Sequence, residues 1–152
     1  MIGVADVLLA NLDSAYDHKG WHGPTLRGAL RGLSVPEVLW RPKERRHNIR
    51  EVALHCAYWK YAVRRRLTGQ KRGSFPVKGS NWFPAADRVG ENDWRDIVRM
   101  LDHEHAQLRS AIESLSRRTF GDAKKLRLIY GVAAHDLYHA GQIQLIKRLY
   151  EN

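Results

Sequence analysis

The sequence predicts an all-α protein, an antiparallel bundle of four long helices. Four segments carry apolar residues at helical spacing, and no run alternates between apolar and polar residues as a half-buried strand would. The 152 residues are 43% hydrophobic and 28% charged, a balance typical of a folded soluble domain. A chain of this length builds one compact core, so we expect a single domain over residues 1–152.

The N-terminal third is predicted to hold one long helix and short helical pieces. The first helix is expected over about residues 2–17, where apolar residues recur at helical spacing: Val4, Val7, Leu8 and Leu12. After a polar break that contains glycine, residues 25–33 predict one or two helical turns. Ser34 and Glu37 then form a capping-box pattern, which predicts a short helix that ends before Pro42.

A second capping pattern, Asn48 with Glu51, predicts the start of a long helix that Gly69 ends. Residues 70–90 contain glycines, two prolines and no sustained period, so they predict a long loop. Such a loop is uncommon in a compact domain unless it is a lid, a binding loop or a disordered stretch. Its large aromatic residues favour packing against the rest of the molecule: Phe75, Trp82 and Phe83.

The third and fourth long helices fill the C-terminal half. Apolar residues at intervals of three, four and seven predict a helix over residues 91–115: Trp94, Ile97, Leu101, Leu108, Ile112 and Leu115. Asp122 is a candidate N-cap for the last helix, which we expect over about residues 123–150.

Composition excludes several classes of protein. A single cysteine, Cys56, excludes an intrachain disulfide framework and a cysteine-only zinc site. No apolar stretch is long enough to cross a bilayer, and the first segment lacks the basic start of a signal peptide, so we expect a cytoplasmic protein. Lys and Arg number 26 against 16 Asp and Glu, and the resulting charge of +10 favours polyanions as partners in general.

Three of the eight histidines interrupt apolar helix faces. His135 and His139 are four residues apart, so both rings project from one face of the last helix, and Gly131 leaves room beside the pair. His55 has the same setting on the second long helix. Three neutral imidazoles suit zinc, nickel or iron(II) and leave positions open for water or substrate. The alternative is that each is a hydrogen-bonded histidine of the core.

Two segments carry a family resemblance. Residues 47–59, HNIREVALHCAYW, resemble the second-helix motif of the DinB-like (damage-inducible) family, and residues 135–143, HDLYHAGQI, resemble its last-helix motif. The family's metal histidines fall on His55, His135 and His139. The resemblance implies an up-down-down-up four-helix bundle, a divalent metal on these histidines and frequent homodimers. It also implies a relation to bacterial thiol-dependent S-transferases that use a low-molecular-weight thiol.

A metal at this site would activate either water for hydrolysis or a thiol for S-transfer. Hydrolysis calls for a carboxylate base, and the candidates are poor. Asp136 either orients a ligand or forms a surface ion pair, and we favour the surface pair. Glu51 is already explained by its capping box, so thiol transfer is slightly favoured. Gln142 lies on the histidine face and bonds either a ligand or a neighbouring helix.

Other candidate residues receive mainly packing interpretations. Cys56 is expected to be a small buried hydrophobe, His105 a satisfied core histidine, Tyr138 a packing residue and His103 exposed. Four aromatic residues either roof an apolar substrate pocket or pack in the core and loops: Trp21, Trp40, Trp82 and Phe83.

Two alternative functions remain open from the sequence. A nucleic-acid or polyanion binder is suggested by basic clusters in different loops and helix ends: Arg64 to Arg66, Arg41 to Arg46, and Lys124, Lys125 and Arg127. No recognition-helix or zinc-finger pattern accompanies them. The other alternative is a metal-free dimeric helical scaffold.

Overall fold

The computed structural model describes residues 2–83, 89–115 and 118–152. Over these ranges the chain is helical, with one isolated β-bridge between Ser80 and Trp82 and no strand, which confirms the all-α prediction. The elements in order are α1 (Val4–Tyr16), α2 (Leu26–Ala29), α3 (Val35–Leu39), α4 (Ile49–Thr68), α5 (Glu91–Glu113), the 3₁₀ turn η1 (Thr119–Gly121) and α6 (Ala123–Glu151).

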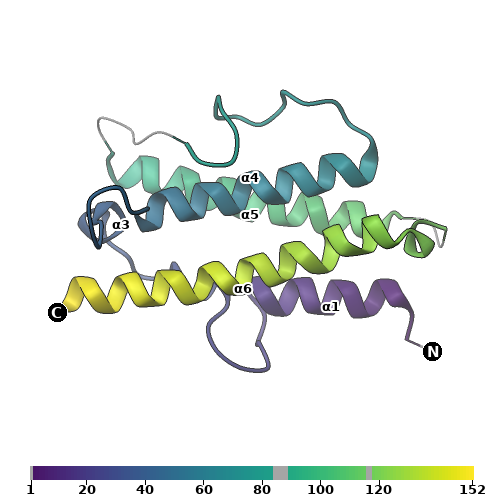
Figure 1. Ribbon diagram of the computed structural model, residues 1–152, viewed down its shortest axis with the longest axis horizontal. Coiled ribbons are helices and arrows are strands. Elements are labelled where there is room, and N and C mark those ends of the chain that lie inside the picture. The colour runs from purple at the N-terminus through teal and green to yellow at the C-terminus, as the bar shows by residue number, and fades with distance from the viewer. Residues whose placement is uncertain (1, 84–88, 116–117) are drawn as a thin grey trace.

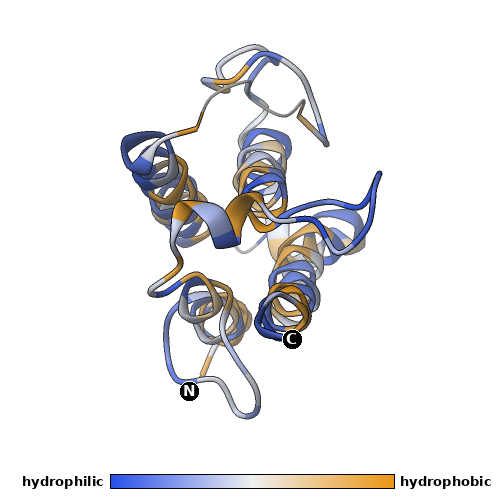
Figure 2. Ribbon diagram, turned by 90° about the vertical axis from the view of Figure 1, so that its left-hand side faces the viewer, coloured by the Kyte–Doolittle hydropathy of each residue, from blue (hydrophilic) through white to orange (hydrophobic). Residues whose placement is uncertain are grey.

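Four long helices lie side by side. In Figure 1, α1 and α6 run in one direction, and α4 and α5 run in the other. Helix α4 packs against α5 and α6, and α1 packs against the other sides of α5 and α6, so the four surround a common interior, as the end-on view of Figure 2 shows. After α4 the chain from Gly69 to Phe83 returns along the bundle. Residues 84–88 of the predicted loop lie outside the described part.

The predicted helix ends coincide with local hydrogen bonds. The Asn48 side chain accepts from the backbone N–H of Glu51 at 2.9 Å, and the Glu51 carboxylate accepts from the backbone N–H of Asn48 at 3.4 Å. Gly69 ends α4 with φ +74°, in the left-handed region that glycine adopts readily. Asp122 caps α6 by accepting from the N–H of Lys124. These caps confirm the predicted boundaries of α4 and the start of α6.

The apolar core consists of two clusters with a polar layer between them. One cluster includes Leu54 of α4, Leu101 of α5 and Ile143 of α6. The other includes Leu108 of α5 and Ile129 of α6. The buried polar side chains between the clusters come from α4, α5 and α6: His55, Lys60, Glu104, His105, Asp136 and His139. The candidate site and an ion-pair network both lie in this layer.

None of the helices within the described ranges is long and apolar enough to cross a membrane.

Candidate metal centre

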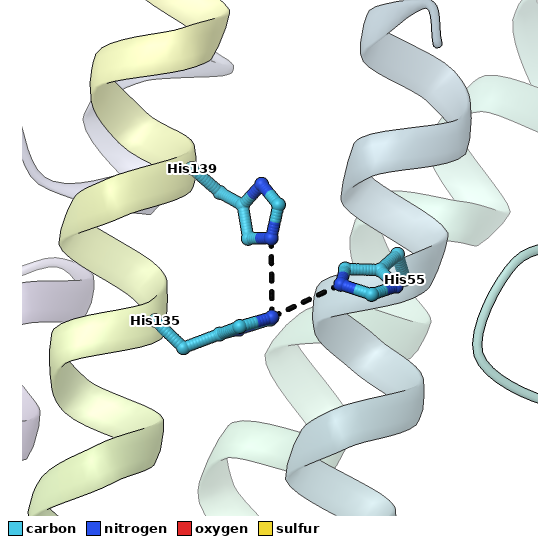
Figure 3. A group of neighbouring side chains, drawn as sticks. All are labelled: His55, His135 and His139. Carbon is cyan, nitrogen blue, oxygen red and sulfur yellow. Dashed lines mark hydrogen bonds between the residues drawn. The ribbon is translucent and has the colours of Figure 1, made fainter.

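Three histidine rings converge between α4 and α6. His135 and His139 project from α6 one turn apart, and His55 projects toward them from α4 (Figure 3). Nε2 of His135 lies 3.0 Å from Nε2 of His55 and 3.1 Å from Nε2 of His139. The helical spacing and the inward apolar stripes thus bring together the three histidines that the sequence singled out.

Partners on the far side of two rings fix where their lone pairs point. Nδ1 of His55 donates to the backbone carbonyl of Asn81 at 2.8 Å, because a carbonyl can only accept. Nδ1 of His139 donates to Oε1 of Gln142 at 2.7 Å, and Nε2 of Gln142 donates to the Tyr138 hydroxyl at 2.9 Å. In a neutral imidazole whose Nδ1 carries the proton, Nε2 is a bare lone pair. His55 and His139 therefore both present lone pairs to the space beside His135.

This donor set fits a divalent metal. One proton on His135 Nε2 can satisfy only one of the two lone pairs that face it, whereas a cation accepts from all three nitrogens. Tetrahedral zinc with Zn–N bonds of about 2.0–2.1 Å separates its nitrogen ligands by about 3.4 Å, slightly more than the 3.0 and 3.1 Å between Nε2 of His135 and Nε2 of the other two histidines. The three possible ligand atoms lie within 4.8 Å of one another. The carbonyl of Asn81 and the amide of Gln142 supply the outer hydrogen bonds typical of metal-bound histidines.

Burial keeps the rings neutral, the form that binds metal. Loss of solvent lowers the pKa of His55 to about 4, with the hydrogen bond to Asn81 opposing that shift. Burial and the neighbouring His139 lower the pKa of His135 to about 3. The pKa of His139 is also lowered, again mainly by burial.

The triad lies in the wall of an open, mostly apolar cavity of about 650 Å³. The Trp82 ring is stacked between two imidazoles, with centroids 3.9 Å from His55 and 3.6 Å from His47. Nε1 of Trp59 donates to Oδ1 of Asn81 at 3.0 Å. The loop before α5 is thus attached to the site through two consecutive residues, Asn81 and Trp82, while side chains from the C-terminal half of α6 line the opposite wall: Tyr138, Leu145, Ile146 and Leu149.

A buried ion-pair network lies behind the triad. Nζ of Lys60 donates to Oδ2 of Asp136, and both side chains are 0% exposed. Lys60 Nζ also lies 3.3 Å from Nδ1 of His105, whose ring stacks on Tyr16 at 3.8 Å, and the Tyr16 hydroxyl donates to Asp102. The interpretation of Asp136 as a surface pair is therefore wrong. Its carboxylate is sequestered by Lys60, which the sequence did not single out.

A second group of possible ligands overlaps the triad. Cys56, His135 and Asp136 also place ligand atoms within 4.8 Å of one another. Burial raises the pKa of the Cys56 thiol well above its ordinary value, so it stays protonated, and Asp136 already pairs with Lys60. The triad is the better metal-binding group, and Cys56 is the buried small residue that the sequence predicted.

The other histidines and the aromatic residues considered in the sequence differ in whether they line the cavity. His105 is buried and partnered, as expected of a core histidine, and His103 is exposed. Of the four aromatic residues considered as a roof, only Trp82 lines the cavity, whereas Phe83 is in the core and Trp40 packs edge-on against Tyr150. Trp21 is fully exposed, so neither the roof nor the packing interpretation holds for it.

Two residues of the site had no assigned role in the sequence: His47 stacks on Trp82, and Asn81 orients His55. Tyr138, expected to be a packing residue, is exposed, lies edge-on to the His139 ring and accepts a hydrogen bond from Gln142. Asn81 has φ +62°, a conformation that asparagine tolerates better than most residues, so the residue type is the local signal in the sequence that could have marked this position.

One comparison with known protein families identifies a match over most of the chain. The model of the DinB superfamily matches residues 21–143, a span that contains α4, all three histidines and most of α6. No curated protein and no solved structure matches the chain. Because this match covers well over half of its length, the chain belongs to the DinB superfamily.

Proposed function

We propose that this protein binds one divalent metal ion through His55, His135 and His139, and that it is a metal-dependent enzyme acting on a small molecule. The observation that carries the proposal is the convergence of three imidazole nitrogens, two with their lone pairs fixed by outer hydrogen bonds, on the wall of a cavity of about 650 Å³. Zinc, nickel and iron(II) all suit imidazole ligands.

When bound, such an ion acts as a Lewis acid and makes a hydroxide or a thiolate available near neutral pH. The chain contributes position and environment. Asn81 and Gln142 hold two ligand rings, Trp59 and Trp82 wall the site, and apolar side chains of α6 limit the water around it. Three protein ligands leave at least one coordination position for a substrate, as in catalytic rather than structural sites.

The set of groups around the triad favours thiol S-transfer over hydrolysis. Among the described residues that line the cavity there is no Asp or Glu to act as a general base. Asp136 pairs with Lys60, and Glu51 pairs with Arg41 and lies 3.0 Å from Nδ1 of His47. A thiol needs only the metal to become a nucleophile, so a low-molecular-weight thiol is the proposed cosubstrate.

A homodimer is proposed as the assembly. Helix α6 is partly apolar on its outer side as well as its inner side, an arrangement typical of helices buried on both faces. The exposed apolar side chains of this helix are Tyr130, Leu137, Tyr138, Leu145, Leu149 and Tyr150. Light scattering would report a dimer for the wild type and a monomer for Leu137→Asp, and a wild-type monomer at micromolar concentration would refute the assembly.

An activity screen tests the proposed reaction. Metal-loaded protein would be assayed with several low-molecular-weight thiols against electrophiles, and in parallel with ester and amide substrates. Thiol-dependent turnover is expected for the wild type and for His103→Ala, an exposed histidine outside the site, and is expected to be lost in His139→Ala. Turnover of esters or amides without any thiol would instead assign hydrolysis, and no turnover with either class would contradict an enzymatic role.

A further inference from the structure

A second cavity, of about 350 Å³, lies in the same groove between α4 and α6. Its apolar part is formed by Trp59, Val63, Leu128, Gly131, Val132 and one face of His135. It shares Trp59 and His135 with the larger cavity, which continues toward Val52 and His55 on α4. Because α4 and α6 run in opposite directions, the two cavities follow one another along the groove, and Trp59 with His135 separates them.

Uncompensated positive charge lies at this second cavity. Lys124 and Arg127 line it, both are exposed, and neither side chain forms an ion pair within the described part of the chain. The guanidinium of Arg66 lies 5.6 Å above the Trp59 ring. The nearby carboxylate of Asp122 accepts from the backbone N–H of Lys124 as the helix cap. No carboxylate lines the described wall of the cavity, whereas Arg64, on the neighbouring helix α4, pairs with Glu104.

The space beside Gly131 is open. A Cβ built on Gly131 meets no heavy atom within 4 Å, and the residue has ordinary helical geometry. A larger side chain at this position would therefore fill the cavity without straining the backbone, and would raise the helix propensity of α6. Gly141, ten residues later on the same helix, is equally open but lines neither cavity, so it provides a matched control.

We propose that this second cavity binds a small organic anion with an apolar body, such as an aryl or alkyl carboxylate. The apolar body lies against Trp59, Val63 and Leu128, and the acid group is bound by Lys124 and Arg127. An apolar interior with a few convergent polar groups is the usual form of a small-molecule site, and charge-assisted hydrogen bonds give the acid its preference over a neutral analogue. The bound molecule would contact His135 from the side opposite His55. This site does not rest on the presence of the metal.

Calorimetric titration of metal-free protein with phenylbutyrate and with its uncharged amide, phenylbutyramide, tests the site. Since a hydrogen bond to a charged group contributes roughly 1.5–3 kcal/mol, we expect the acid to bind at least about tenfold more tightly than the amide. Gly131→Leu should weaken the binding of both probes by about tenfold or more, because it occupies the space, and Gly141→Leu should leave both within about twofold of wild type. Equal affinities for acid and amide, no binding of either, or equal effects of the two glycine variants would overturn the proposal.

Charge variants give a second readout that leaves the core untouched. The double variant Lys124→Gln with Arg127→Gln should reduce the affinity for phenylbutyrate about tenfold and leave that for phenylbutyramide unchanged. The control, Lys19→Gln with Lys43→Gln, also removes two positive charges, but from exposed residues outside the cavity. It should change the affinity for phenylbutyrate by less than about twofold. An equal loss in the control would mean that net charge alone attracts the anion, which would refute a specific site.

Discussion

The backbone carbonyl of Asn81 accepts the Nδ1 proton of His55 at 2.8 Å, and this bond turns the Nε2 lone pair of His55 toward His135. A residue of the loop thereby determines the tautomer of a residue on α4 that precedes it by 26 positions. The side chain of the same loop residue accepts from Nε1 of Trp59, so two hydrogen bonds attach the loop to α4, one of them to the proposed ligand His55. The metal affinity of the site should therefore depend on whether the loop keeps the Asn81 carbonyl in place beside His55.

Substitution of Asn81 should separate the role of its backbone from that of its side chain. Asn81→Val places a β-branched residue at φ +62°, where about 1–2 kcal/mol of strain would displace the carbonyl and weaken zinc binding about tenfold. Asn81→Gly keeps that conformation and the carbonyl and loses only the bond to Trp59, so zinc affinity should stay within about threefold. Competition titration with a chromophoric chelator measures both values. Equal affinities for the two variants would contradict the role of the carbonyl.

Gln142 should control zinc affinity through His139. Gln142→Leu removes the acceptor of the Nδ1 proton, and loss of such an outer partner typically costs about 10- to 100-fold in metal affinity. Gln142→Glu keeps an acceptor and should restore wild-type affinity or exceed it. Gln144→Leu, on the same helix but outside the cavity wall, is the control. If Gln142→Leu binds zinc as tightly as Gln144→Leu, Gln142 does not contribute to the metal site.

Zinc affinity should change little between pH 7.5 and pH 5.5. Metal binds only neutral imidazole, so affinity falls as pH drops through the pKa of each ligand. Three histidines of ordinary pKa 6.5 would lose about 1000-fold over this interval. The pKa values of about 4 for His55 and about 3 for His135 keep these rings neutral throughout. At most His139 contributes, so the expected loss is about tenfold or less. A decrease in zinc affinity of several hundredfold between pH 7.5 and pH 5.5 would show that the three imidazoles are solvated and titrate with ordinary pKa values.

Removing only one charge of the buried Lys60–Asp136 ion pair should lower the free energy of unfolding. Lys60→Met leaves a buried carboxylate without its cation, which costs about 3–5 kcal/mol. The double variant Lys60→Met with Asp136→Leu removes both charges and should recover most of that loss. Urea unfolding of the metal-free proteins measures the free energies. If the double variant is as unstable as the single one, the two charges do not compensate each other in the native state.

The sequence predicts the helices and the triad because their signals are local. The capping pair Asn48 and Glu51 and the spacing of His135 and His139 require no knowledge of tertiary contacts. His55 joins the site because the apolar faces of α4 and α6 pack against each other.

The parts that sequence could not predict depend on long-range contacts. Lysine is rarely buried without a partner, and the partner of Lys60 is 76 positions away, so neither Lys60 nor the burial of Asp136 could be deduced from helical spacing. The attachment of Asn81 and Trp82 to the site likewise involves a loop with no period. The polar layer between the two apolar clusters follows from these pairings.

The metal content of untagged protein tests the central claim most directly. Elemental analysis by mass spectrometry, after dialysis with zinc and removal of free ion, should give about one metal ion per chain for the wild type and for His103→Ala, as a single three-histidine site requires. Each of His55→Ala, His135→Ala and His139→Ala should reduce this to a small fraction while retaining helical circular dichroism. Wild-type protein that holds no stoichiometric metal after reconstitution with zinc, nickel or iron(II), or triad variants that hold as much as His103→Ala, would contradict the account.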